Sequence, residues 1–313
     1  MTQSIRVKPK SRSRLIKYTA EDRVVDVYVY VSLIALCVIT LYPFINTLAI
    51  SLNDAIDSVR GGIYLWPRMF TWANYSNILT SNTVNMTYAL RNSAGRALIG
   101  GSLSTFSCML LAYTLTRREF VLRKAYNFLL VASMYVSGGL IPGYLTVKAY
   151  GLINNYMVYI LPGLVGAYNV LVMRTFIGGI PNELVESAKL DGAHEYRILF
   201  GIIFPLSMPV IATIMLFVSV AQWNAWFDTM LYCAAKKELT TLQFELQKLL
   251  ASATVSADQD MIASTESMKV GGTVTPNSIR AAMTILVTLP ILFVYPFLQR
   301  YFVKGLTIGA VKG

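Results

Sequence analysis

Six segments of this 313-residue chain are apolar over the length that a membrane requires. A transmembrane helix needs about 20 consecutive, mostly apolar residues. The segments that meet this condition cover residues 26–50, 88–116, 123–147, 155–178, 200–224 and 280–303. Charged residues make up only 14% of the chain, against about a quarter in soluble domains. We therefore expect an all-α membrane protein with six transmembrane helices.

The basic residues indicate which ends of these segments face the cytoplasm. Positively charged residues gather on the cytoplasmic side of membrane proteins. They lie mainly before the first segment and at one set of segment ends: Arg6, Lys8, Lys10, Arg12, Arg14, Lys17, Arg23, Arg117, Arg118, Arg123, Lys124, Arg174, Lys189, Arg197, Arg300, Lys304 and Lys312. We therefore expect both termini and the stretch 181–199 inside the cell. The net charge of +11 does not form one surface patch, so no nucleic-acid partner is expected.

The same pattern divides the chain into three parts. Residues 1–25 form a basic cytoplasmic tail, residues 26–84 hold the first helix with an external loop, and residues 85–310 form a core of five helices. A second long external loop covers residues 225–279. The first apolar segment is too long for the apolar region of a signal peptide, so we expect it to stay in the protein.

Small residues and prolines predict how the helices pack. The second segment has a small residue at every fourth position: Ser93, Ala97, Gly101 and Thr105. Such a face lets membrane helices approach closely. The other segments contain Pro43, Pro142, Pro162, Pro205, Pro209, Pro290 and Pro296. Each interior proline removes a helix hydrogen bond, which a neighbouring helix or a polar cavity must compensate.

The stretch 181–205 begins with an unusually charged segment that includes His194, the single histidine of the chain. Pro181 suits the first position of a helix and Gly192 suits its end. A helix over residues 181–190 would be about 15 Å long, which is too short to span a membrane. It leads directly into the fifth segment, so a force on it would reach a spanning helix. The residues alone leave a solvated loop open as the alternative.

A longer pattern in this stretch resembles a known family. The residues are Glu186-Ser187-Ala188, then Asp191-Gly192-Ala193, then Ile202, Phe204 and Pro205. They are similar to the EAA motif of bacterial ABC-importer permeases: E-A-A, three residues, G, nine residues, I-x-L-P. Ser187 replaces an alanine and Phe204 replaces a leucine, and both keep the small or apolar character. The resemblance covers about residues 85–310.

The resemblance implies a type I importer fold with both termini in the cytoplasm. It also implies that the protein lies in the cytoplasmic (inner) membrane of a bacterium. In the family, this segment is the coupling helix that docks on an ATPase subunit. The residues expected to couple are Glu186, Ser187, Ala188, Asp191, Gly192, Ala193, Tyr196, Arg197 and Pro205. The implied partners are a second, homologous permease subunit, two ATPase subunits that bind ATP and magnesium, and an extracytoplasmic solute-binding protein.

Two further stretches resemble the carbohydrate-type permeases, related to the smaller maltose-permease subunit. They are AQWNAWFDTMLY at 221–232 and RYFVKGLTIGAVKG at 300–313, and they are most similar to the complex-polysaccharide subgroup of LplC-like and YtcP-like permeases. An oligosaccharide substrate is therefore expected, and sugars are bound by aromatic faces, amides and carboxylates. The candidate pathway residues are Trp223, Asn224, Trp226, Asp228, Tyr232, Tyr144 and Asn169, with Tyr168 beside them. An interfacial aromatic belt, helix-end caps or an interhelical hydrogen bond stay open as alternatives.

The chain has no phosphate-binding loop of the form G-x-x-x-x-G-K-[ST], so ATP hydrolysis is expected on the partner subunits. No nucleophile–base pair or metal-binding set points to catalysis. Three alternatives are an ABC permease for peptides or polyamines, a stand-alone secondary transporter, and an intramembrane enzyme. A secondary transporter would need repeats and intramembrane ionisable residues, whereas Arg96 is the main charge within a segment. The leucines of 240–253 predict a helix that docks the binding protein or packs on the partner permease.

Overall fold

The computed structural model describes residues 20–80, 86–256 and 275–310. Over these ranges the chain is helical and contains no strand, although Asn53 and Phe70 form an isolated antiparallel bridge. The first part comprises α1 (Ala20–Ser51), α2 (Ala55–Val59) and α3 (Ala73–Thr80). The second long helical element follows, and we call it the second rod. It is made of α4 (Met86–Gly95), a π-helical turn (Arg96–Gly100) and α5 (Gly101–Thr116).

The remaining helices complete the core and the outer loops. They are α6 (Arg123–Tyr135), α7 (Leu140–Ala149), two 3-10 turns (Tyr156–Tyr159 and Leu161–Gly163), α8 (Ala167–Gly178), α9 (Asn182–Leu190), α10 (Glu195–Ile198) and a π-helical turn (Leu199–Ile203). The last are α11 (Phe204–Leu206), α12 (Met208–Asn224), α13 (Phe227–Tyr232), a 3-10 turn (Lys237–Leu239), α14 (Leu242–Ser256) and α16 (Pro276–Ala310).

Three of these helices are long and apolar enough to cross a membrane, and the number rises to five if each of two bent pairs is one span. The three are Glu21–Ser51, Met86–Thr116 and Pro276–Val294. One bent pair joins Tyr156–Gly163 to Ala167–Gly178 at 47°, and the other joins Glu195–Leu206 to Met208–Asn224 at 77°. The six-span layout stays a prediction.

The segment 123–147 does not form the continuous helix that its hydropathy predicted. It is divided between α6 and α7, and residues 136–139 separate them. Gly139 has φ +83°, a conformation that a residue with a Cβ rarely adopts and that no α-helix can continue. With 13 residues, α6 is about 20 Å long, which is shorter than the apolar core of a bilayer.

Prolines occur both at breaks and inside helices. Pro162 lies in a 3-10 turn before α8, and Pro205 and Pro209 lie on either side of the sharp bend at Ser207. By contrast, Pro43 lies within the continuous helix α1, as Pro290 does within α16. A proline alone therefore does not break a helix in this chain.

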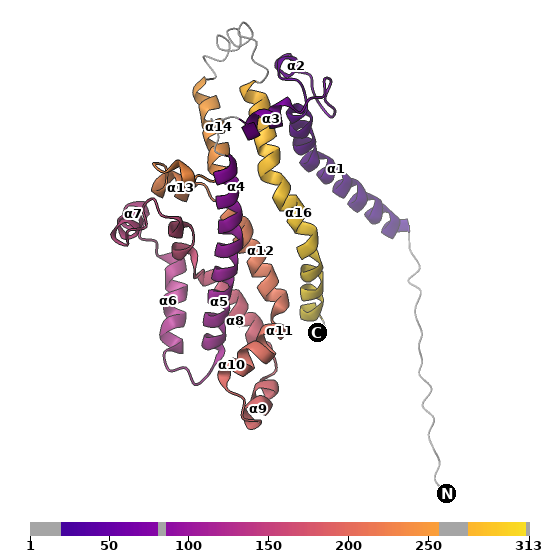
Figure 1. The fold of residues 1–313 in the computed structure, drawn as a ribbon. Helices are drawn as coiled ribbons and strands as arrows, with labels where there is room; N and C mark the ends of the chain where they lie inside the picture. Colours follow the sequence, from indigo (N-terminus) through magenta and orange to yellow (C-terminus); the bar gives the residue numbers. More distant parts are fainter. Residues whose placement is uncertain (1–19, 81–85, 257–274, 311–313) are drawn as a thin grey trace.

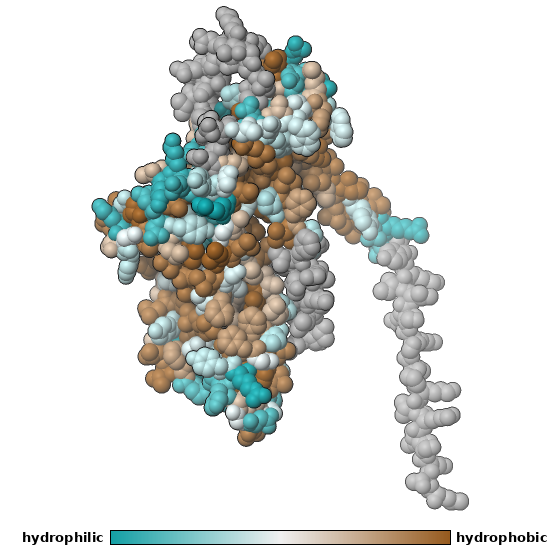
Figure 2. Space-filling view, in the orientation of Figure 1, coloured by the Kyte–Doolittle hydropathy of each residue, from teal (hydrophilic) through white to brown (hydrophobic). Residues whose placement is uncertain are grey.

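The helices form an elongated bundle, and different helices lie at its two ends (Figure 1). At one end lie α9 and α10, and at the other lie α2 and α14. The visible surface is largely apolar over the middle of α5, α6 and α12, whereas polar residues gather near α9 on one side of this band and near α7 and α13 on the other (Figure 2). The helix α1 extends away from the bundle, and its most apolar stretch is not buried within this chain. This arrangement fits a membrane that covers the middle of the molecule.

The face of small residues in the second rod allows the close packing predicted for it. Ser93 and Thr105 are buried, and so are the two residues between them in the pattern. A Cβ at Gly101 would overlap Ser219 Oγ and would lie 3.3 Å from Ser219 Cα, so α5 and α12 are almost in backbone contact. Ser93 Oγ also accepts a hydrogen bond from the Leu242 amide at 2.9 Å.

The helix predicted within the long loop 225–279 is present as α14. Leu242 and Leu246 are buried against α4 and α16, and Leu249 packs on the same cluster. These three leucines therefore pack within the chain, whereas Leu250 is 40% exposed. The sequence predicts a side that docks the binding protein or packs on the partner permease, and that prediction stays open only for the exposed part of the helix. The rest of that loop, 257–274, lies outside the described residues.

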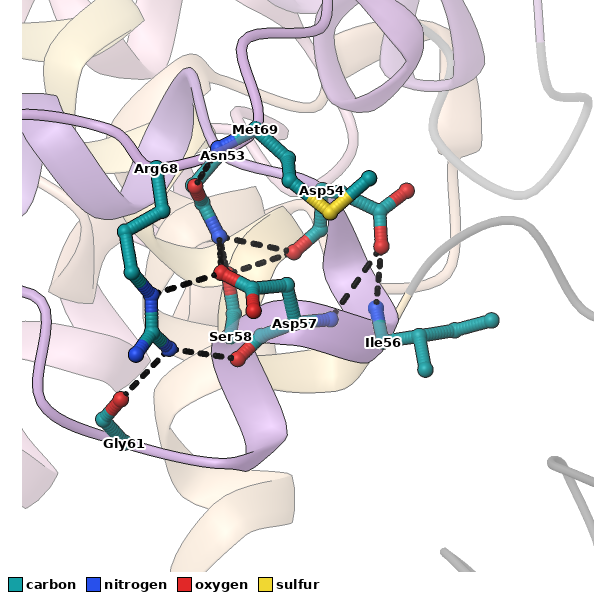
Figure 3. A network of polar contacts seen from close by, with 8 residues as sticks. All are labelled: Asn53, Asp54, Ile56, Asp57, Ser58, Gly61, Arg68 and Met69. Atoms are coloured by element: carbon teal, nitrogen blue, oxygen red, sulfur yellow. Dashed lines mark hydrogen bonds and ion pairs between the residues drawn. The ribbon is translucent and has the colours of Figure 1, made fainter.

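The loop between α1 and α3 is held by a polar network (Figure 3). Asn53 Nδ2 donates to Asp57 Oδ2 and to Ser58 Oγ, each at 3.0 Å. Arg68 Nε donates to the same Asp57 oxygen at 3.0 Å. The hydrogen bond from Asn53 is the largest cause that lowers the pKa of Asp57, and the Arg68 contact adds to it. The network closes loop 54–69 on the end of α1.

Candidate docking surface and translocation cavity

A glycine turn ends α9 and fixes its position. Gly192 has φ +75°, and its amide donates to the Lys189 carbonyl at 3.0 Å. The Ala193 amide donates to the Ala188 carbonyl at 2.9 Å. These two hydrogen bonds are those of a Schellman motif, in which glycine supplies the left-handed residue after the helix. Pro181 lies at the N-cap, one residue earlier than predicted.

The helix α9 has one buried and one exposed side. Val185 is 5% exposed and packs in a cluster with Ile198 and Ile203, below the start of the bent pair. The opposite side, with Glu186 and Ser187, is exposed. Leu190 is 89% exposed at the tip of the molecule.

Lys189 links α9 to two other elements. Its ammonium group lies 2.9 Å from Glu119 Oε1, in the loop after α5, and 3.0 Å from Glu195 Oε1, at the start of α10. Glu195 also accepts a hydrogen bond from Tyr113 of α5. The Lys189 contact is the main cause that lowers the pKa of Glu119, and the same contact raises the pKa of Lys189. A displacement of α9 would therefore act on α5 and α10 together.

In the middle of the bundle, a buried arginine joins the second rod to the fifth segment. Arg96 is 1% exposed and forms an ion pair with Asp228. Its guanidinium also donates to Gln222 Oε1 at 2.9 and 3.0 Å, and to the Ala225 carbonyl at 3.1 Å. The Tyr159 ring lies 4.5 Å from the guanidinium carbon. Burying a charge is costly unless the group is paired and hydrogen-bonded, as this guanidinium is.

A cavity of about 540 Å³ opens beside this ion pair. Its lining is Arg96, Ser104, Val158, Tyr159, Pro162, Gly163, Tyr168, Asn169, Phe217, Val218, Ala221, Gln222, Ala225, Asp228 and Tyr232. Ser104 Oγ is buried and has no hydrogen-bond partner in the part of the chain that the structure describes. The lining thus combines aromatic rings with an amide, a carboxylate and a free hydroxyl. These groups can bind a polar molecule that has apolar faces.

Comparison with known proteins shows the family to which a chain with this fold and cavity belongs. The family model described as the binding-protein-dependent transport system inner membrane component matches residues 105–308. The chain belongs to this family. Its members are membrane components of transporters, so the chain is a transport subunit.

Relatives of this permease match almost its whole length. It is 34% identical over 293 residues to the polygalacturonan/rhamnogalacturonan transport system permease protein YtcP of Bacillus subtilis (strain 168), and the match covers 94% of this chain and 100% of that protein. Protein LplC of the same strain is also 34% identical, with 94% and 97% covered. A crystal structure of a bacterial ABC transporter involved in the import of the acidic polysaccharide alginate has the same fold, with a TM-score of 0.80, 23% identity, and 91% and 99% coverage.

The structure places most of the predicted coupling residues of the permease together. Glu186, Ser187 and Ala188 lie on α9, and Asp191, Gly192 and Ala193 form the turn after it. Tyr196 and Arg197 are exposed on α10, next to this turn. Pro205 lies apart, in α11, where the chain enters the bend. His194 is exposed at the N-cap of α10, and its side chain makes no capping hydrogen bond.

The predicted pathway residues divide into two groups. Asn169, Asp228 and Tyr232 line the cavity, and Tyr144 stacks on Tyr232 with ring centres 6.0 Å apart. The structure does not bring the other three to the cavity. Trp223 is buried and donates to the Val287 carbonyl of α16 at 3.0 Å, Asn224 is exposed, and Trp226 packs edge-on against Phe227.

Tyr159 and Gln222 of the cavity, and the bridging role of Lys189, do not follow from the sequence of the permease. Arg96 was noted as a charge within a segment but was not assigned to the pathway. A buried charge needs a partner, so it was the available signal for a polar centre. The residues around it come from distant parts of the chain and could not be paired without the fold.

Proposed function

We propose that this permease is one membrane-spanning subunit of an ABC importer for oligosaccharides. It pairs with a homologous permease and spans the membrane six times with both termini in the cytoplasm. Two ATPase subunits, which hold ATP and magnesium, bind below it. A solute-binding protein delivers the substrate from outside. The observation that carries this proposal is the exposed, EAA-like surface of α9 in a chain of this family.

The contacts of α9 support its role as the coupling helix. Its buried residue Val185 packs under the bent pair that ends in α12, and Lys189 joins it to the loop after α5. Both α12 and α5 contribute residues to the cavity. ATP-driven movement of the ATPase subunits would therefore be passed through α9 to two walls of the cavity.

The lining of the cavity supports an oligosaccharide as the substrate. Tyr168 and Tyr232 provide rings, and Asn169, Asp228 and Ser104 provide hydrogen-bonding groups for hydroxyls. The relative YtcP carries polygalacturonan and rhamnogalacturonan in its name, and others are named for arabinooligosaccharides. We propose that the substrate is a fragment of a polysaccharide such as those of plants, and that acidic fragments are tested first.

The docking role is tested with two charge reversals on one helix. Glu186→Arg changes a residue of the EAA-like pattern, whereas Glu183→Arg makes the same charge change one turn earlier. Each tagged variant is purified from native membranes under mild detergent, and mass spectrometry identifies the retained partners. We expect wild type and Glu183→Arg to retain an ATPase and a second permease, and Glu186→Arg to lose only the ATPase. Wild type that retains no ATPase contradicts the proposal.

The substrate class is tested on the complete reconstituted transporter. ATP hydrolysis is measured with its binding protein and with oligogalacturonides, neutral oligosaccharides or short peptides. We expect a severalfold stimulation by one of the sugars and none by peptides. Stimulation by peptides alone would support an importer of another solute.

A further inference from the structure

A second cavity, of about 670 Å³, lies between α9 and the loop after α5. Its lining is Thr116, Arg117, Arg118, Glu119, Arg123, Arg174, Thr175, Ile177, Gly178, Ile180, Asn182, Val185, Glu186, Lys189 and Ile203. Five of these side chains are basic and two are acidic. The buried residues Ile177, Val185 and Ile203 form part of the lining, so the cavity reaches into the core of the subunit.

The acidic groups do not neutralise the arginines of this cavity. Glu119 is paired with Lys189, which also pairs with Glu195. None of Arg117, Arg118, Arg123 and Arg174 forms an ion pair with another residue in the described ranges. The only hydrogen-bond acceptor found for the Arg174 side chain there is the neutral Asn127 amide. Glu186 also lines the cavity, and it forms no ion pair with these arginines in the described ranges. The cavity therefore gathers four guanidinium groups that have no direct ion-pair partner among the described residues.

The side chain of Arg117 is held in place by an aromatic ring. The Arg117 guanidinium lies over the Tyr113 ring, with its central carbon 4.3 Å from the ring centre. Its Nε is buried and has no hydrogen-bond acceptor within the described chain. A buried donor without an acceptor is unfavourable, so this nitrogen is available to an acceptor that enters the cavity.

The arrangement matches a phosphate group better than a carboxylate. The arginines come from three elements: the loop after α5, the start of α6 and α8. A carboxylate offers two oxygens, whereas a phosphate offers three or more and accepts paired hydrogen bonds from several guanidinium forks. Asn182, the first residue of the nine-residue helix α9, also lines the cavity, and the N-terminal end of a helix favours an anion.

We propose that this cavity binds a phosphate group, supplied by the head group of a membrane phospholipid or by a soluble phosphate. Basic pockets between membrane helices on the cytoplasmic side bind such head groups. Bound there, the phosphate links the loop after α5, α6 and α8 to the base of α9. It thereby adds a second tie between the coupling helix and the bundle, next to the Lys189 bridge. This site is separate from the translocation cavity.

The test compares two variants with matched charge in the complete transporter. Arg117→Gln/Arg123→Gln removes two guanidiniums from the cavity, and Arg60→Gln/Arg91→Gln removes two exposed ones elsewhere. Calorimetry measures binding of short-chain phosphatidylglycerol and of inorganic phosphate. We expect wild type and the control to bind one of these anions, and the cavity variant to bind it at least tenfold more weakly. Lipid binding that phosphate does not displace identifies the lipid as the source, whereas phosphate binding identifies the soluble source.

A second measurement needs no variant and so does not depend on folding. Phenylglyoxal modifies accessible arginines, and mass spectrometry locates the modified peptides in wild type. We expect the anion that binds to protect Arg117 and Arg123 but not Arg60, and chloride at equal ionic strength to protect none. In the calorimetry, no binding by wild type, or equal binding by wild type, the cavity variant and the control variant, would overturn the proposal. In the modification experiment, the absence of selective protection of Arg117 and Arg123 would do the same.

Discussion

At the scale of single residues, Gly101 is the glycine of the described chain at which a Cβ would have the least space. A Cβ there would overlap Ser219 Oγ and approach the Ser219 backbone. Gly101→Ala should force α5 and α12 apart and destabilise the subunit by about 1–3 kcal/mol, as overpacking does. The midpoint of thermal unfolding in detergent measures this. Gly201→Ala is the control, because no atom lies within 4 Å of its Cβ; equal losses for the two variants would disprove the close contact.

At Gly192, the backbone conformation limits substitution, whereas neighbouring atoms do not. A Cβ there would meet nothing within 4 Å, but its φ of +75° is unfavourable for any residue with a side chain. Gly192→Ala should weaken the turn after α9 by about 1 kcal/mol. The predicted observable is faster hydrogen exchange of the Ala193 amide, which depends on the Ala188 carbonyl. The matched change Gly178→Ala, also in open space and with ordinary φ, should leave that amide unaffected.

At the scale of elements, the Lys189 bridge makes the attachment of α9 depend on pH. The pKa of Glu119 is lowered, so its contribution is present above the ordinary glutamate value and is lost as pH falls through the lowered one. The pKa of Lys189 is raised, so its contribution is lost only as pH rises through the raised value. We expect the protection of the α9 amides from hydrogen exchange to stay constant between about pH 6 and 9. At pH values below about 4, this protection should decrease.

The variant Lys189→Gln is the control for this pH dependence. It removes both contacts with Glu119 and Glu195, so protection of α9 should be lower at neutral pH and should respond less to acid. Both partners are partly exposed, so the effect should shrink as salt is raised. A wild-type protein whose α9 loses protection between pH 6 and 9 would show that another group controls this helix.

Elements were predictable from sequence where their signals are local. The turn at Gly192 and the leucine spacing of α14 fix those two helices to within a few residues. The break before α7 was missed because hydropathy averaged over some twenty residues is insensitive to one glycine with positive φ. Trp223 was placed in the pathway because its neighbours resemble a family motif, yet its indole donates to the Val287 carbonyl. Only the packing of α12 on α16 decides whether the Trp223 side chain points to the cavity or to α16.

At the scale of the whole molecule, the translocation cavity depends on contacts between distant parts of the chain. Arg96 and Asp228 are 132 residues apart and meet only when the second rod packs against the end of α12. The sequence showed a charge within a segment, but it could not show which carboxylate neutralises it. The same holds for the arginines of the second cavity, whose positions at segment ends indicated only the side of the membrane.

This ion pair leads to a prediction about which partner matters more. The Arg96 side chain is 2% exposed, whereas that of Asp228 is 25% exposed beside the cavity. Asp228→Asn would leave a buried guanidinium without its counter-charge, so we expect a loss of about 2 kcal/mol or more in unfolding free energy. Arg96→Gln leaves a carboxylate that water can reach, so the charge left behind costs less. The double variant should therefore lose less than the sum of the single losses, by about 1–3 kcal/mol. Additive losses would mean that the two groups do not stabilise each other, and that Gln222, Tyr159 and the Ala225 carbonyl hold Arg96 in the cavity wall without help from Asp228.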